Sequence, residues 1–250
     1  MARTNDWTRD QRLLALRIYL RLPFGKLSRT NRDIIALAKV IGRTPDALAM
    51  KAVNFAGIDP NLHRAGLSGA SKGDRELWAE FEANPTKIAL EIEEAAKRLK
   101  APQPVLDHVI RLPTGPTEKD RVVKVRLVQT FFRDAVQITY DGRCAISGIS
   151  CTELLTASHI IPWSVSVEHR ADPRNGLCLN ALFDRAFDRG LFTFDEDHRV
   201  VLSKRLRDDA ESAKLPCSLL EAEGKKLTLP KRFPPLAESL EYHRREVFRG

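Results

Sequence analysis

Residues 154–190 constrain the fold of this chain more than any other stretch. A short apolar run ends at His159, a long polar loop follows, and Asn175 precedes a second apolar run. Asp184 and Asp188 then lie four residues apart in a stretch with helical spacing, which places both carboxylates on one helix face. This order predicts two short strands followed by a helix, with the four polar side chains close together.

The same four residue types suit the hydrolysis of a phosphodiester. A neutral histidine can take a proton from water at pH 7, and carboxylates bind the hard divalent ions that stabilise a leaving oxygen. The amide of Asn175 can bond loop backbone, so we expect it to hold the loop 161–174 that aims His159. Taken singly, each residue has a structural alternative: a buried histidine, a turn asparagine, or aspartates paired with neighbouring arginines. Their combination favours a metal-dependent phosphodiesterase.

The composition indicates a globular protein with a polyanionic partner. The chain has 250 residues, 43% of them hydrophobic, and a formal net charge of +8. Its four cysteines form no CxxC pair, which favours a reduced, cytoplasmic setting over a disulfide framework. No apolar stretch reaches the roughly 18 residues of a membrane span, and the N-terminus lacks a signal-peptide pattern. We therefore expect no membrane association.

Residues 1–100 read as a helical domain that resembles DNA-binding modules. Thr8, Asn31 and Thr44 are suitable N-caps for three helices, and a tight Gly-Arg-Thr-Pro turn precedes the third. This pattern matches a helix-turn-helix, in which the third helix would enter the major groove. The candidate contacts are Arg43, Lys51 and Asn54. The alternative is an ordinary three-helix packing unit.

The four prolines within residues 101–120 predict a linker between that domain and a second one at residues 121–250. The second domain should contain a helix from about Val122 to Tyr140, a hairpin within 191–203 and a C-terminal helix. The predicted fold class is therefore α+β, a helical domain followed by a strand–strand–helix core flanked by helices.

Residues 121–250 resemble the HNH, or ββα-metal, endonucleases, in the variant common in restriction and phage-defence proteins. The matching motifs are Ala157-Ser158-His159-Ile160, Pro162-Trp163, Asn175-Gly176-Leu177, Phe187-Asp188-Arg189-Gly190-Leu191 and the tail Glu241-Tyr242-His243-Arg244. The resemblance implies that His159 is the general base and that Asn175 fixes the loop. It also implies that Asp184 and Asp188 hold one Mg²⁺ or Mn²⁺ per site, with Ser158 as a weaker ligand where relatives often have aspartate or histidine.

The chain departs from many HNH relatives in a second respect. Where they carry two CxxC pairs for structural zinc, this chain has Cys144 with Ser147 and Asn180 with Phe183, so no structural zinc is expected. Apolar packing must then hold the core. The candidates are Leu155, Ile160, Trp163, Leu177, Leu179, Leu182 and Phe187.

The function predicted from the sequence is a metal-dependent endonuclease that hydrolyses double-stranded DNA in a restriction or phage-defence system, with dependence on base modification as a sub-hypothesis. Arg170 and Arg174, in the loop before Asn175, are candidate phosphate contacts. A homodimer would let two sites cut both strands, although no sequence feature demonstrates one. The alternative is a non-catalytic DNA-binding regulator on an HNH scaffold. RNA is a less favoured substrate because no aromatic stacking platform is visible.

Overall fold

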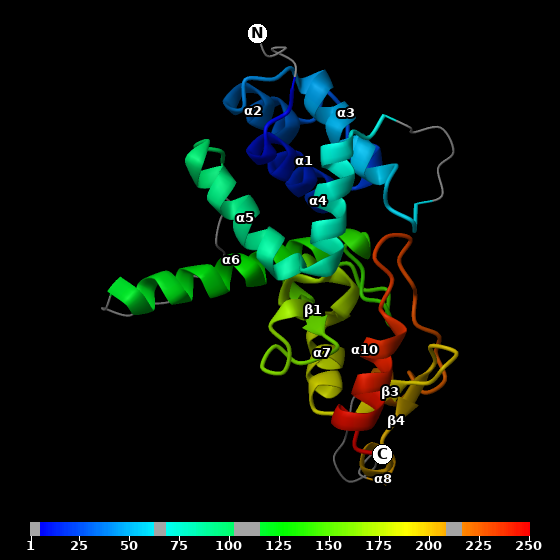
Figure 1. Ribbon diagram of the computed structural model, residues 1–250. Helices are drawn as coiled ribbons and strands as arrows, with labels where there is room; N and C mark the ends of the chain where they lie inside the picture. Colours follow the sequence, from blue (N-terminus) through cyan, green and yellow to red (C-terminus); the bar gives the residue numbers. More distant parts are fainter. Residues whose placement is uncertain (1–5, 63–68, 103–115, 209–216) are drawn as a thin grey trace. The chain divides into compact units, whose positions relative to one another are not determined.

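The computed structural model describes residues 6–62, 69–102, 116–208 and 217–250. The chain divides into two compact units, Met1–Asp134 and Ala135–Gly250 (Figure 1). Of the predicted linker, residues 103–115 lie outside the described residues, and helix α6, Pro116–Thr139, begins within it and runs across the division between the units. Helices and two small antiparallel sheets together give the predicted α+β class. None of the helices in the described ranges is long and apolar enough to cross a bilayer.

The first unit is helical, and its helices begin where the sequence places them. They are α1 (Arg9–Arg21), α2 (Arg32–Val40), α3 (Pro45–Ala56), α4 (Lys72–Ala83) and α5 (Pro85–Arg98), followed by α6. Thr8, Asn31 and Thr44 accept hydrogen bonds from the first turns of α1, α2 and α3, which confirms the three predicted caps. Pro45 occupies the first turn of α3, where a missing N–H costs nothing.

Helix α1 lies at the centre of this unit, packed against α3, α4 and α5. All eight residues from Leu13 to Leu20 are buried, because this stretch carries a single charge and is apolar on every side. That charge, Arg17, lies 3.8 Å from the buried Glu93 carboxylate on α5. The hydroxyl of Tyr19 donates to Asp59 at 2.6 Å. Arg17 and Tyr19 of α1 thus have polar partners inside the unit.

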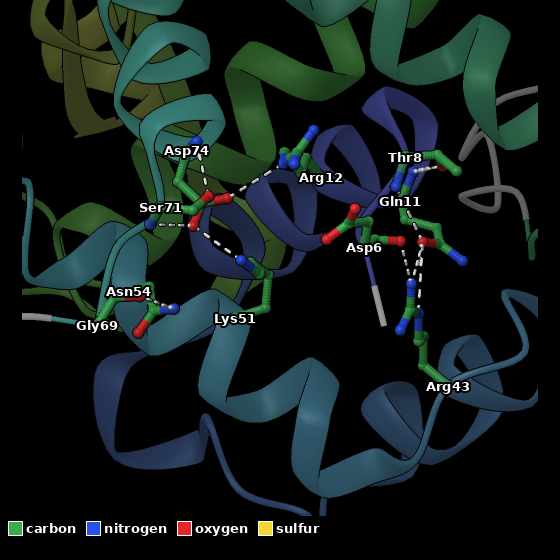
Figure 2. A network of polar contacts seen from close by, with 10 residues as sticks. All are labelled: Asp6, Thr8, Gln11, Arg12, Arg43, Lys51, Asn54, Gly69, Ser71 and Asp74. Atoms are coloured by element: carbon green, nitrogen blue, oxygen red, sulfur yellow. Dashed lines mark hydrogen bonds and ion pairs between the residues drawn. The ribbon is translucent and has the colours of Figure 1, made fainter. Parts of the chain in front are cut away.

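The structure corrects the prediction that α3 reads DNA through Lys51 and Asn54, whereas the contact predicted for Arg43, just before α3, stays a prediction (Figure 2). Lys51 is buried and its ammonium lies 2.8 Å from the fully buried Asp74 carboxylate. Asn54 is also buried and donates to the Gly69 carbonyl at 3.1 Å. Arg43 is half-buried and donates to the Asp6 carbonyl at 2.6 Å and to the Gln11 side chain. These three side chains hold the helical unit together, since each is committed to an internal partner.

The second unit contains the predicted strand–strand–helix core. Its elements are β1 (Leu155–His159), β2 (Gly176–Asn180), α7 (Ala181–Asp188), β3 (Phe192–Phe194), β4 (Val200–Leu202), α8 (Lys204–Asp208), α9 (Cys217–Leu220) and α10 (Ala237–Tyr242), which continues as a π-helical turn, His243–Val247. Strands β1 and β2 are antiparallel and pair His159 with Gly176. Strands β3 and β4 form the predicted hairpin around the turn Asp195–His198.

An aromatic cluster joins α7 to the hairpin and to the C-terminal segment. Phe187 packs against Phe192 and Phe194 with ring centroids 5.4 and 5.8 Å apart, and it stacks on the His243 ring at 3.6 Å. Burying such a side chain stabilises the fold by about 1.5–3 kcal/mol. Five of the seven predicted core residues are buried; the prediction is wrong for Leu182, which is 37% exposed on α7, and for Trp163, which is half-exposed.

The buried Lys51–Asp74 pair predicts a stability effect rather than a loss of DNA contact. We expect Lys51→Met to lower the free energy of unfolding by about 3 kcal/mol, because it leaves the Asp74 carboxylate buried without its nearest cation. Lys72 is the matched control: its side chain is 91% exposed and pairs with Glu76 at 3.8 Å, so Lys72→Met should cost below about 0.5 kcal/mol. Urea denaturation measures both values, and equal effects would contradict the structural role of Lys51.

Candidate functional site

Strand pairing fixes the direction of His159 and Ser158 at the end of β1. Ser158 pairs with Leu177 and His159 with Gly176, the first residue of β2. Adjacent residues within a strand point to opposite faces of the sheet, but His159 is the last residue of β1. Both residues border one cavity of about 480 Å³, which α7 and the C-terminal segment also line.

Asn175 fastens both ends of the loop that follows His159. Its side-chain carbonyl accepts from the Ile161 amide at 2.8 Å, and its side-chain NH₂ donates to the Ile161 carbonyl at 3.1 Å. The Ile160 amide donates in turn to the Asn175 backbone carbonyl at 2.9 Å. Asn175 is 1% exposed, so these bonds are shielded from water. The structure therefore contains the loop contacts that the sequence predicts for this amide.

The Arg170 carbonyl in this loop orients the His159 ring. Nε2 lies 3.1 Å from the Arg170 backbone oxygen, and because a carbonyl only accepts, Nε2 carries the proton. The second ring nitrogen, Nδ1, is then the basic one. The ring also meets the Trp163 ring edge-on at 5.6 Å.

Burial controls the protonation of His159. It lowers the pKa of the imidazole to about 4, and the hydrogen bond to the Arg170 carbonyl only partly opposes this shift. The ring is therefore neutral at pH 7, in the form that can accept a proton.

Helix α7 presents Asp184 and Asp188 to the same cavity. Asn180 caps the helix by accepting from the amides of Leu182 and Phe183 at 3.0 Å. Burial raises the pKa of Asp184, and the nearby Ser158 hydroxyl and Arg185 oppose that rise. Asp188 is an exposed residue, but partial desolvation of its carboxylate, followed by the charge of Asp184, raises its pKa to about 6. A pair of carboxylates in which the charge of Asp184 raises the proton affinity of Asp188 forms a site suited to a cation.

The donor set at the cavity fits a magnesium-like ion. Asp184 and Asp188 supply hard carboxylate oxygens, and the buried Ser158 hydroxyl lies beside Asp184 at the same cavity. No group of three or more His, Cys, Asp and Glu side chains with metal-ligand geometry occurs in the described ranges. Mg²⁺ is often held by one or two carboxylates, with water and substrate phosphate completing its shell. The residues present therefore fit an ion shared with substrate rather than one caged by protein.

The structure gives Arg170 and Arg174 internal contacts, and their phosphate contacts stay a prediction. Arg174 donates twice to the buried Asp172 carboxylate, at 3.0 and 2.9 Å. Arg170 donates to the Trp163 carbonyl at 3.0 Å, and its guanidinium lies over the Trp163 ring at 4.8 Å. Both side chains make contacts within the loop whose Arg170 carbonyl bonds the His159 ring.

Four basic or imidazole side chains that line the cavity are not among the site residues predicted from the sequence. Arg185 and Arg189 lie on α7 one turn apart, and their spacing alongside the aspartates was a usable signal. His243 and Arg249 come from the C-terminal segment, more than 50 residues from α7 in the chain, and no local pattern connects them to the site.

The positions considered for structural zinc are joined by hydrogen bonds. The Asn180 amide donates to the Ser147 hydroxyl at 3.1 Å, and the Ser147 backbone amide donates to the Cys144 sulfur at 3.4 Å. Cys144 and Cys178 are buried free thiols, and burial raises the pKa of Cys178 to about 12. The turn before β1 and the start of α7 are thus connected by protein groups.

A known protein family matches the segment that contains this site. Residues 144–195 match the family model described as HNH endonuclease. This range contains β1, β2 and α7, together with the hairpin strand β3. No curated protein sequence matches the chain. The HNH resemblance of the sequence is confirmed for this segment.

The neutral state of His243 predicts an acid-sensitive contribution to stability. Its ring is bonded to the Phe187 carbonyl at 3.2 Å and to the Thr193 hydroxyl at 3.0 Å, and burial lowers its pKa from 6.5 to about 4. Below pH 6.5 the imidazole binds a proton in the unfolded chain but not in the folded chain. The contribution of His243 to the free energy of unfolding is therefore complete above pH 6.5 and is lost as the pH falls toward 4.

Comparison with a variant that does not titrate isolates this effect. The stability difference between wild type and His243→Gln should be constant above pH 6.5 and should shrink by up to about 1.4 kcal/mol per pH unit below it. Urea denaturation at a series of pH values measures the difference, in which all other titrating groups cancel. A gap that stays constant down to pH 4.5 would show that His243 is not held neutral.

Proposed function

We propose, from the HNH endonuclease domain at residues 144–195, that the protein is a metal-dependent endonuclease that hydrolyses phosphodiester bonds of double-stranded DNA. The observation that carries the proposal is the convergence of His159, Ser158, Asp184 and Asp188 on one cavity. A base without an ion site, or an ion site without a base, would not support this chemistry.

The base in this proposal is Nδ1 of His159. It accepts a proton from the water that attacks phosphorus, while Nε2–H stays bonded to the Arg170 carbonyl and fixes the ring plane. The water oxygen forms the new bond to phosphorus, and the bond to the 3′ oxygen breaks. Base catalysis of this kind contributes about 10²–10⁴ in rate. Burial keeps the ring neutral and ready at pH 7.

Asp184, Asp188 and Ser158 would hold the divalent ion, Mg²⁺ or Mn²⁺. When bound, that ion neutralises charge on the phosphate and stabilises the leaving oxygen. The raised pKa values of the two carboxylates favour this assignment, because each aspartate gains from a cation placed beside it. Arg185 and Arg189 add positive charge at the same cavity, where the DNA backbone would lie.

The setting of the activity belongs to the same proposal. A restriction or phage-defence role, acting on DNA in the cytoplasm, follows from the family variant that the sequence resembles, and dependence on modified bases follows from it as a sub-hypothesis. The helical residues 1–100 would select the DNA, through surfaces other than the buried Lys51 and Asn54. A homodimer would place two cavities on opposite strands.

The second candidate is a DNA-binding regulator on an inactive HNH scaffold. Ser158, in place of a stronger ligand, is the observation that favours it. It predicts DNA binding that neither depends on a divalent ion nor is accompanied by strand cleavage.

Cleavage of duplex DNA distinguishes the two candidates. We expect wild type to cut with Mg²⁺ or Mn²⁺, to stop in EDTA, and to lose about 10²–10⁴ in rate in His159→Asn while still binding DNA. His198 in the β3–β4 turn is the matched control; its φ of 61° is tolerated by asparagine, so His198→Asn should cut at the wild-type rate. Binding without cleavage by the wild type, or cleavage that His159→Asn leaves unchanged, would reject the enzyme.

A further inference from the structure

The C-terminal segment, red in Figure 1, returns to the end of helix α7 and is fixed there by backbone contacts. The Phe248 amide donates to the His243 carbonyl at 2.9 Å, which closes the π-helical turn. The Arg249 amide then donates to the Gly190 carbonyl at 2.9 Å. His243 adds a side-chain bond to the Phe187 carbonyl. The backbone at Arg249 is therefore held next to the last turn of the helix that carries Asp188.

Gly190 makes this close approach feasible. Its φ of +66° lies in the region that glycine adopts without strain. A Cβ at this position would also collide with the Val247 carbonyl oxygen. Any other residue here would displace the C-terminal backbone, so the position of Arg249 depends on this glycine.

Arg249 contributes a cation to the cavity that the acidic pair does not neutralise. Three arginines, Arg185, Arg189 and Arg249, line the cavity against two aspartates. Arg185 and Arg189 act on the Asp188 carboxylate and lower its pKa, whereas Arg249 is not among the charges that shift Asp184 or Asp188. Arg249 is exposed, and its guanidinium makes no ion pair or hydrogen bond within the described ranges. Arg249 is thus an exposed cation at the border of a space where the proposed substrate carries negative charge.

We propose that Arg249 binds a backbone phosphate of the DNA strand that enters the cavity, so that the C-terminal segment forms part of the substrate site. This inference rests on the proposed function for the identity of the ligand, but not for the contact itself. A guanidinium matches phosphate oxygens through a two-pronged set of donors, and the backbone bond to Gly190 keeps Arg249 beside the cavity. The domain matched at residues 144–195 does not include this residue, so the contact lies outside the family match.

The salt dependence of DNA binding tests the contact directly. Binding of duplex DNA is measured by fluorescence anisotropy on the His159→Asn background, so that no cleavage intervenes. The slope of log K against log salt is negative, and loss of one phosphate contact reduces its magnitude by about 0.9. We expect Arg249→Ala to show this change with about a tenfold loss of affinity at low salt. Arg249→Lys should retain the slope and recover part of the affinity, since it keeps the charge without the guanidinium geometry.

Arg245 is the matched control on the same segment. Its side chain is 70% exposed and pairs with Glu241 at 3.9 Å and Glu246 at 3.5 Å, and it is absent from the cavity lining. Arg245→Ala should leave both slope and affinity at their reference values. Gly190→Ala gives a second route, because it moves the Arg249 backbone without removing the guanidinium. It should reproduce the loss, and adding Arg249→Ala to it should cause little further change.

The outcomes separate this inference from the proposed function. Equal slopes and affinities for Arg249→Ala and Arg245→Ala would overturn the phosphate contact, even if the wild type cleaves DNA. A slope of smaller magnitude for Arg249→Ala alone supports the contact, even if the wild type fails to cut and the protein is a regulator. Thermal midpoints of the arginine variants should match the reference, because both side chains are exposed.

Discussion

The two hydrogen bonds between the Asn175 amide and the backbone of Ile161 are the constraint on which the site depends. They join the start of β2 to the end of β1 across a loop of more than ten residues, and only a side chain with both a donor and an acceptor can make them. Because this loop is closed, the Arg170 carbonyl lies at Nε2 of His159 and selects the ring tautomer. In the proposed reaction, Asn175 would act through backbone geometry, without touching the reacting atoms.

The features that the sequence predicts well are those with a local physical cause. The caps at Thr8, Asn31 and Thr44 act within one turn of helix, so the helix starts can be read from adjacent residues. The i, i+4 spacing of Asp184 and Asp188 fixes their common helix face in the same way. The pairing of β1 with β2 needed the family resemblance as well, because alternation over five residues is a weak signal.

The errors arise where a polar residue finds a partner distant in sequence. Lys51 looks like a groove contact on an isolated helix, but Asp74, 23 residues later, turns it into part of the core. His243 and Arg249 reach the cavity only through the packing of the C-terminal segment on Phe187 and Gly190, so no reading of residues 144–195 could include them.

In the proposed site, α7 would hold one cation and the His159 ring would face it. Diffraction from crystals grown with Mn²⁺ and an uncleavable duplex, recorded at a wavelength where manganese scatters anomalously, tests this arrangement most directly. We predict one anomalous peak bound to Asp184 and Asp188, sharing a phosphate oxygen with the DNA, and Nδ1 of His159 directed at the phosphorus of that phosphate. A peak elsewhere, or a ring whose Nδ1 points away from the phosphate, would contradict the account.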